Sequence, residues 1–307
     1  MVVTLLSYAV ISLYTPRVPL VPPEVLVLVP FSLDQMLQLS LTVSDIIIVV
    51  RKLLTHLKIA VHASYMANTY DFYKPNLSSE YPEVDGPVSV VTYVAALDAA
   101  YSVFKEKIAK LSKRAQLAGY AAEKTHDELF SLEDVDFAIF HSPYGKQAVK
   151  GHARMMFNDF INNPQDPRFA NIPDAEKLLK TSRSATLTDK NIEKVFVNAS
   201  KASFSKKSDP GMACSKRLGN MYTASLYGCL ASLIATVEPQ ALLGKRVSLF
   251  AFGSGCAASF FTLRVKGNTS VMKEKMDLLG RLAQMKVVPP QEFVDALLVC
   301  FRDPSSL

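Results

Sequence analysis

The sequence lacks several features that would define a function class directly. No run of lysines and arginines is interleaved with aromatic residues, so a nucleic-acid-binding function has little support. The four cysteines show no paired metal-ligand spacing, and we therefore expect no metal site. Free thiols are typical of a reducing compartment, which favours a cytoplasmic protein. The formal net charge of +6 is mild and is compatible with an anionic ligand.

A long uninterrupted hydrophobic run is missing as well. Residues 1–61 contain several apolar runs, but Arg17, Pro19 and Pro22 are among the residues that interrupt them. A membrane-spanning helix needs about 20 consecutive apolar residues. A basic segment followed by a small-residue cleavage site, as in a secretory signal, is not clear either. We therefore find no firm evidence for a membrane protein and treat residues 1–61 as a separate apolar N-terminal segment.

The rest of the composition is that of a globular protein. The 307 residues are 49% hydrophobic and 20% charged, which allows one large or two small domains with a sizeable core. We expect a long helix over residues 88–110, a capping box at residues 131–134 and antiparallel strands over 246–252 and 258–265. Loops are expected over 62–87 and 208–218, and a polar irregular connection over 162–188. Further helices are expected over 146–160, 189–206, 220–237, 272–284 and 290–298.

The most informative stretch is a strand that stops at a histidine. Apart from Asp136, residues 135–140 are apolar, which is typical of a strand covered on both faces. Pro143 cannot continue a sheet, and a helical pattern follows. His141 therefore lies just beyond the carboxyl end of a strand, where ligands bind in open α/β sheets. A histidine at such a position is nevertheless more often a hydrogen-bonded structural residue than a catalyst.

Several motifs in the same order resemble one known family. They are Phe140–Tyr144 followed by lysines, residues 219–228, residues 252–255, and residues 70–76, 79–82 and 84–86. This set is similar to the C-terminal half of 3-hydroxy-3-methylglutaryl-CoA (HMG-CoA) synthase, over about residues 62–298, whereas residues 299–307 form a divergent tail. The resemblance implies an α/β, thiolase-like fold. This chain is expected to hold only its C-terminal half, a layered mixed sheet with helices, truncated at both ends.

The resemblance also implies a chemistry. The family joins acetyl-CoA to acetoacetyl-CoA in the mevalonate pathway of isoprenoid and sterol biosynthesis. A cysteine carries the acetyl group, a glutamate removes its proton, and a histidine polarises the acetoacetyl ketone. The cysteine and the glutamate belong to the N-terminal half, which this chain is expected to lack. None of Cys214, Cys229, Cys256 and Cys300 has the nucleophile's sequence context, so we predict no nucleophile and little activity for this chain alone.

The resemblance assigns roles to eight residues. His141 would be catalytic, and Lys146 and Lys150 would bind coenzyme A. The substrate-binding residues would be Pro143, Asn220, Tyr222, Gly253 and Ser254. It implies no cofactor beyond the acyl-CoA substrates, and a homodimer.

Local sequence alone favours simpler roles for several of these residues. Asn220 could be the N-cap of a helix. Lys146 and Lys150, with His152, Arg154 and Asn158, could form a solvated helix face.

Two other interpretations of the whole chain remain open. It could be a non-catalytic binding or interaction protein that retains a coenzyme A surface, because the nucleophile is missing. One half of the family fold would also leave an apolar face uncovered, and such faces drive association or aggregation. It could also be an incomplete gene product.

Overall fold

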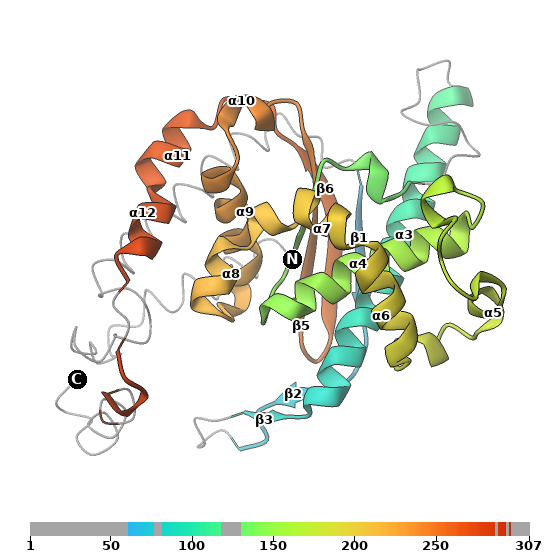
Figure 1. Ribbon diagram of the computed structural model, residues 1–307, viewed down its shortest axis with the longest axis horizontal. Helices are drawn as coiled ribbons and strands as arrows, with labels where there is room; N and C mark the ends of the chain where they lie inside the picture. The colour runs from blue at the N-terminus through green and yellow to red at the C-terminus, as the bar shows by residue number, and fades with distance from the viewer. Residues whose placement is uncertain (1–60, 77–81, 118–129, 286–287, 293–294, 296–307) are drawn as a thin grey trace. The chain divides into compact units, whose positions relative to one another are not determined.

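The computed structural model describes residues 61–76, 82–117, 130–285, 288–292 and 295 (Figure 1). The expectations for residues 1–60, most of 290–298 and the tail at 299–307 lie outside these ranges. Backbone contacts divide the chain into two units, residues 50–275 and residues 1–49 with 276–307. The first unit contains the sheet and everything described below, except the segment from Met276 through the short helix α12 (Leu278–Ala283).

A mixed four-stranded sheet forms the centre of this unit, with the strand order β1-β6-β5-β4. The strands are β1 (His62–Met66), β4 (Phe137–Phe140), β5 (Arg246–Gly253) and β6 (Ala257–Arg264). β4 runs parallel to β5 with Phe140 opposite Phe250, whereas β5 and β6 form the expected antiparallel hairpin. Because β4 ends at Phe140, His141 lies beyond its carboxyl end, as the sequence predicted.

The expectation of a loop over residues 62–87 is wrong in part. β1 pairs with β6, and β2 (Phe72–Tyr73) pairs with β3 (Glu83–Val84) in a separate two-stranded sheet. β1 has the alternation of an edge strand, since Ala63 is buried while both of its neighbours are exposed. These strands are short and lie among turn-forming residues, so their pairing depends on partners that local sequence does not reveal.

Helix α3 (Gly86–Leu117) packs against the sheet and contains the helix expected over residues 88–110. Tyr93, Tyr101 and Phe104 are buried, and the rings of Tyr101 and Phe104 lie 5.2 Å and 5.0 Å from that of Phe260. By length and composition α3 could span a membrane, but about half of its most apolar stretch is buried inside the unit. It therefore acts as a core helix, between the sheet and helix α4 (Gly145–Asn162).

The remaining elements refine the helical expectations. The helix expected over 189–206 is two helices, α6 (Lys190–Ala199) and α7 (Lys201–Lys207), divided at Ser200, whose hydroxyl bonds back to the carbonyl of Val197. The one expected over 272–284 is α11 (Ser270–Met276) and α12, divided at Asp277, whose φ of 37° is left-handed. The other helices are α5 (Ala175–Lys180), α8 (Ala213–Leu218), α9 (Ser225–Thr236) and α10 (Pro239–Leu242). Short 3-10 turns lie at Leu132–Asp134, Pro167–Phe169, Ala185–Leu187, Asp209–Gly211 and Tyr222–Ala224.

Two further expectations resolve clearly. The capping box at Ser131 is confirmed, since its hydroxyl accepts from the backbone N–H of Glu133 and the Asp134 carboxylate accepts from the backbone N–H of Ser131. The loop expected over 208–218 is wrong for α8, whose backbone is anchored where the N–H of Cys214 donates to the hydroxyl of Ser232. That anchor comes from α9, so local sequence did not reveal it.

The expectation of a solvated face on α4 is wrong for three of its residues. His152, Arg154 and Asn158 are buried because α3, α6 and α7 pack around α4. The guanidinium of Arg154 donates to both carboxylate oxygens of Asp98 on α3, at 2.8 Å and 3.0 Å from Nε. Both ring nitrogens of His152 have serine partners, Ser208 at 2.8 Å and Ser203 at 3.1 Å. These buried polar groups are therefore paired, as burial requires.

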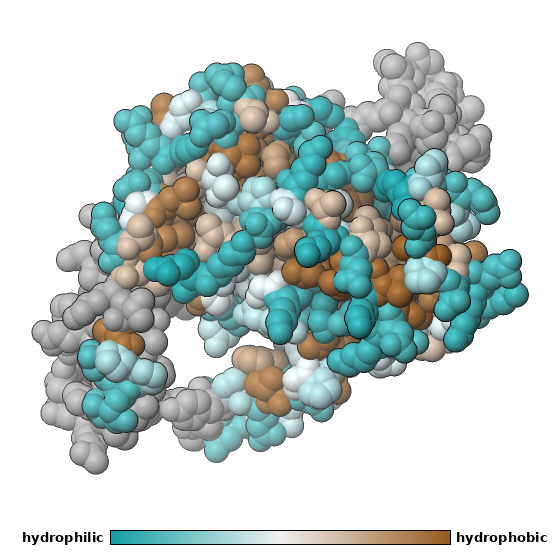
Figure 2. Space-filling view, in the orientation of Figure 1, coloured by the Kyte–Doolittle hydropathy of each residue, from teal (hydrophilic) through white to brown (hydrophobic). Residues whose placement is uncertain are grey.

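Figure 2 shows that the surface over α4, α6 and α7 is mainly hydrophilic, with hydrophobic side chains between the polar ones.

Candidate functional site

A cavity of about 630 Å³ opens beside the end of β4. Three segments far apart in the sequence form much of its wall: the β4–α4 junction, the turn between β5 and β6, and the approach to α9. The β2–β3 region and the start of α3 complete it. Six lining residues are those expected to be catalytic or to bind substrate, namely His141, Pro143, Asn220, Tyr222, Gly253 and Ser254. The structure thus brings these six together, while their roles stay predictions.

Two hydrogen bonds hold the backbone of His141. The backbone N–H of His141 donates to the carbonyl of Phe250 at 2.7 Å, and the backbone carbonyl of His141 accepts from the Tyr93 hydroxyl at 2.8 Å. The ring lies 6.3 Å from that of Phe252. Burial lowers the pKa of His141 from 6.5 to about 4. At neutral pH the imidazole is therefore uncharged, with one N–H donor and one acceptor nitrogen.

Asn220 is exposed at the cavity and shapes the chain ahead of α9. Its Oδ1 accepts from the backbone N–H of Tyr222 at 2.9 Å and from the hydroxyl of Ser225 at 3.2 Å. Asn220 therefore forms an Asx-type turn, and the expectation that α9 begins there is wrong, since α9 begins at Ser225. With Oδ1 engaged, the amide N–H₂ is the group that Asn220 offers to a ligand. Tyr222 has a left-handed φ of 50°, a strained conformation of the kind often found at ligand sites.

Asp71, a residue that the sequence analysis did not single out, holds the Gly253–Gly255 turn. Asp71 is fully buried, and its Oδ1 accepts from the backbone N–H of Gly255 at 3.1 Å and from the Thr69 hydroxyl at 2.8 Å. Burial alone would raise the pKa of Asp71, but these hydrogen bonds outweigh it and lower the pKa. Gly255 has a φ of 117°, which favours glycine. A buried carboxylate thus positions the turn that carries Ser254.

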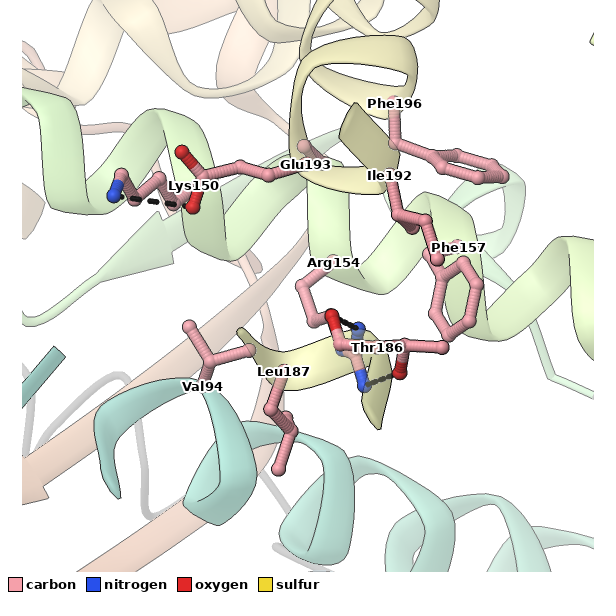
Figure 3. Close-up of a pocket in the computed structure, with 10 residues that line it drawn as sticks. Val94, Lys150, Arg154, Phe157, Thr186, Leu187, Ile192, Glu193 and Phe196 are labelled. Carbon is pink, nitrogen blue, oxygen red and sulfur yellow. Dashed lines mark hydrogen bonds and ion pairs between the residues drawn. The ribbon is translucent and has the colours of Figure 1, made fainter. Parts of the chain in front are cut away.

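The two candidate coenzyme A lysines do not line this cavity. Lys146 is exposed in the first turn of α4. Lys150 pairs with Glu193 at 3.1 Å and borders a second pocket of about 30 Å³, between α4 and α6 (Figure 3). Figure 3 shows that, on another side of that pocket, the guanidinium of Arg154 donates a hydrogen bond to the hydroxyl of Thr186. This second pocket is far smaller than the cavity of about 630 Å³ and is too small for a ligand of the size of coenzyme A.

The described cysteines are poor candidates for a nucleophile. Cys214, Cys229 and Cys256 are free and buried, and burial raises the pKa of each thiol, for Cys229 to about 11. Within the described ranges, no thiol lines the large cavity. Cys300 lies outside those ranges. The described residues also contain no group of three or more metal-binding side chains placed to hold an ion.

The mixed sheet with its packed helices, and a cavity at the strand ends, define a thiolase-like protein, which confirms the predicted fold class. A family model described as "Hydroxymethylglutaryl-coenzyme A synthase C terminal" matches residues 56–300. The chain belongs to the HMG-CoA synthase family and matches its C-terminal part, as the sequence motifs predicted.

Sequence and structural similarity to known proteins support this assignment. A hydroxymethylglutaryl-CoA synthase of Ganoderma lucidum is 54% identical over 237 residues, which are 77% of this chain and 49% of that protein. A mitochondrial hydroxymethylglutaryl-CoA synthase of Sus scrofa is 40% identical over 244 residues, 77% of this chain and 46% of that protein. The solved structure of MvaS in complex with 3-hydroxy-3-methylglutaryl coenzyme A has a TM-score of 0.59 at 26% identity, covering 79% of this chain and 50% of that one. The chain spans about half the length of the curated relatives it matches.

Proposed function

We propose that this chain binds acyl-CoA thioesters in the large cavity and supplies the part of HMG-CoA synthesis that orients and polarises the acetoacetyl group. The observation that carries the proposal is the convergence of His141, Asn220 and the Gly253–Gly255 turn on one cavity. The family's role in the mevalonate pathway, and a relative solved with 3-hydroxy-3-methylglutaryl coenzyme A, support it.

The polarising step needs hydrogen-bond donors where negative charge develops. When a carbon nucleophile attacks the acetoacetyl ketone, the ketone oxygen becomes an alkoxide. The N–H of neutral His141 and the amide N–H₂ of Asn220 are the donors we assign to that oxygen. Glycines in the turn around Ser254 allow backbone groups to approach the substrate closely. His141 acts as an uncharged donor because its imidazolium would form only near pH 4.

The coenzyme A moiety extends beyond the acyl group and carries phosphates. Lys146 is exposed in the first turn of α4, one residue before Gln147, which lines the cavity. We propose that Lys146 pairs with a phosphate, and that Lys150 does so only by leaving Glu193. No cofactor beyond the acyl-CoA substrates is part of the proposal. We further propose a homodimer and a cytoplasmic location.

A second candidate is a non-catalytic coenzyme A-binding protein. The observation in its favour is that none of the described thiols lines the cavity, so the described residues offer no group to carry the acetyl intermediate there. The two candidates share the binding step and differ in the condensation step.

Calorimetric titration of the full chain with acetoacetyl-CoA tests the shared step. We expect saturable binding that His141→Ala weakens by about three- to ten-fold, the effect of losing one hydrogen bond. His62→Ala is the matched control, because His62 is exposed on β1 and does not line the cavity. Absence of binding, or equal binding by the His141 variant, would contradict the proposal. Release of free coenzyme A from acetyl-CoA and acetoacetyl-CoA by this chain alone would rule out the non-catalytic candidate.

A further inference from the structure

Ser225 holds the turn ahead of α9, and the reaction described above gives it no role. It is the first residue of α9 and is fully buried. The oxygen of its hydroxyl accepts from the backbone N–H of Met221 at 2.8 Å, and the hydroxyl donates to Oδ1 of Asn220 at 3.2 Å. A serine at the start of a helix commonly accepts from N–H groups of the helix itself. Both bonds of Ser225 instead go to residues that precede α9.

These bonds determine which end of the Asn220 amide faces the cavity. The amide atom that lies 2.9 Å from the backbone N–H of Tyr222 must be an acceptor, because a backbone N–H only donates. That atom is therefore Oδ1. The oxygen of the Ser225 hydroxyl already accepts from Met221, so its hydrogen is available for the same Oδ1. Two donors thus converge on the amide oxygen and leave the N–H₂ as the group that Asn220 offers at the cavity.

Without such bonds the turn that Ser225 holds would be open to other conformations. Asn220 is exposed, and the terminal torsion of an asparagine side chain is broad. Tyr222 has the left-handed φ of 50°, a conformation that persists only where the surrounding structure enforces it. Ser225 bonds to the two residues before Tyr222, one through its backbone and one through its side chain. It therefore restrains both the backbone turn and the amide.

We propose that Ser225 is a positioning residue that aims the N–H₂ of Asn220 at the ketone oxygen of the bound acyl group. The inference rests on the proposed acyl-CoA binding and adds to it the residue that orients one of the two donors. Ser225 does not line the cavity, so it does not touch the ligand. Its effect on binding therefore passes through Asn220.

The test is a double-mutant cycle on the full chain. Calorimetry gives the dissociation constants of acetoacetyl-CoA and of butyryl-CoA, which has the same chain length and no ketone, for the wild type, Ser225→Ala, Asn220→Ala and the double variant. Ser232→Ala is the matched control. Ser232 is buried on the same helix and does not line the cavity, and its hydroxyl likewise accepts from one backbone N–H, that of Cys214, and donates one bond, to the carbonyl of Gly228.

We expect Ser225→Ala to weaken acetoacetyl-CoA binding by about three- to ten-fold, the effect of one hydrogen bond, and butyryl-CoA binding by less than about two-fold. In the Asn220→Ala background the same substitution should change acetoacetyl-CoA binding by less than about two-fold, because no amide is left to orient. Ser232→Ala should lower the melting temperature as Ser225→Ala does and leave the binding of both thioesters unchanged. If Ser225→Ala does not fold, Ser225→Cys replaces it in the cycle, since a thiol is a weaker donor and acceptor.

Two kinds of failure are distinguishable. Wild-type affinity in the Ser225 variant, equal weakening of both thioesters, or equal weakening with and without the Asn220 amide would make Ser225 a structural residue and overturn this inference alone. Wild-type affinity in Asn220→Ala would overturn it together with the donor role proposed for Asn220. Failure of the wild-type chain to bind either thioester would overturn the proposed function and this inference together.

Discussion

His141 lies between β4 and α4, and His152 lies within α4. Burial lowers the pKa of both, to about 4 for His141 and to about 3 for His152, where the nearby Lys207 cation contributes. Their surroundings differ in another respect. Ser203 and Ser208 occupy both ring nitrogens of His152, whereas His141 lines a large cavity.

This difference teaches that a depressed histidine pKa does not by itself identify a functional site. Desolvation acts equally on a histidine in the core and on one in a cavity wall. What separates the two is whether the polar groups around the ring are already paired. The interior region around His152, which includes Asp98 and Arg154, is paired. The cavity region instead includes buried polar atoms of Asp71 and Gln147 that have no hydrogen-bond partner among the described residues.

The largest expected effect is in the interior region. Arg154→Met leaves the buried Asp98 carboxylate without its cation, so we expect the free energy of unfolding to fall by about 3–5 kcal/mol. Urea denaturation measures this loss. Arg168→Met is the control, because Arg168 and its partner Asp166 are partly exposed and the pair should contribute less than about 1 kcal/mol. Equal losses in the two variants would show that the buried Arg154–Asp98 pair contributes no more to stability than the partly exposed Arg168–Asp166 pair.

The second prediction sets the two histidines against each other. His152→Ala removes a fully buried ring and its hydrogen bonds to Ser208 and Ser203. We expect the substitution to lower the free energy of unfolding by about 2–4 kcal/mol. His141→Ala opens an existing cavity further and should cost about 1 kcal/mol or less, while it weakens acetoacetyl-CoA binding. Thermal and urea unfolding of both variants, side by side, measure the contrast. It fails if His141→Ala is the more destabilising of the two.

The third prediction concerns pH. Between pH 6.5 and about 4 the unfolded chain binds protons at His141 and His152 that the folded chain does not, so stability rises with pH across this window. Stability is therefore lost as pH falls below 6.5, by at most about 1.4 kcal/mol per pH unit for each histidine. His152→Phe keeps a ring in place and should reduce this slope by about half. An identical slope in the variant would contradict the assigned cause.

The smallest effect is expected where the two regions meet. A Cβ at Gly151 would lie 3.0 Å and 3.2 Å from two ring carbons of Phe140, the residue before His141. We expect Gly151→Ala to lose about 1 kcal/mol of stability, because this overpacking exceeds the gain in helix propensity. Gly145→Ala is the matched control, since its nearest neighbour beyond the adjacent residues is Met212, 4.0 Å away. If Gly151→Ala is as stable as Gly145→Ala, then Phe140 moves easily and the backbone at His141 is not held rigidly.

The sequence predicted much of the cavity region and little of the interior one. Strong apolar runs located β4 and the β5–β6 hairpin, and the family motifs named six residues that the structure brings to one cavity. The burial of Arg154 could not be predicted from α4, because its partner Asp98 comes from α3. Asp71 and Ser225 were missed for the same reason. Each acts through a neighbour, the turn at Gly255 or the amide of Asn220, that only the folded chain reveals.

The measurement that tests the comparison most directly is a nitrogen NMR spectrum of the histidine rings during titration with acetoacetyl-CoA. Signals are assigned by their loss in His141→Ala and in His152→Phe. The account predicts that the ring signals of His141 shift on binding while those of His152 stay in place, because only the His141 ring borders the cavity. If saturating ligand leaves the His141 signals unchanged, or shifts those of His152 alone, the acyl group does not bind beside His141 and the account is wrong.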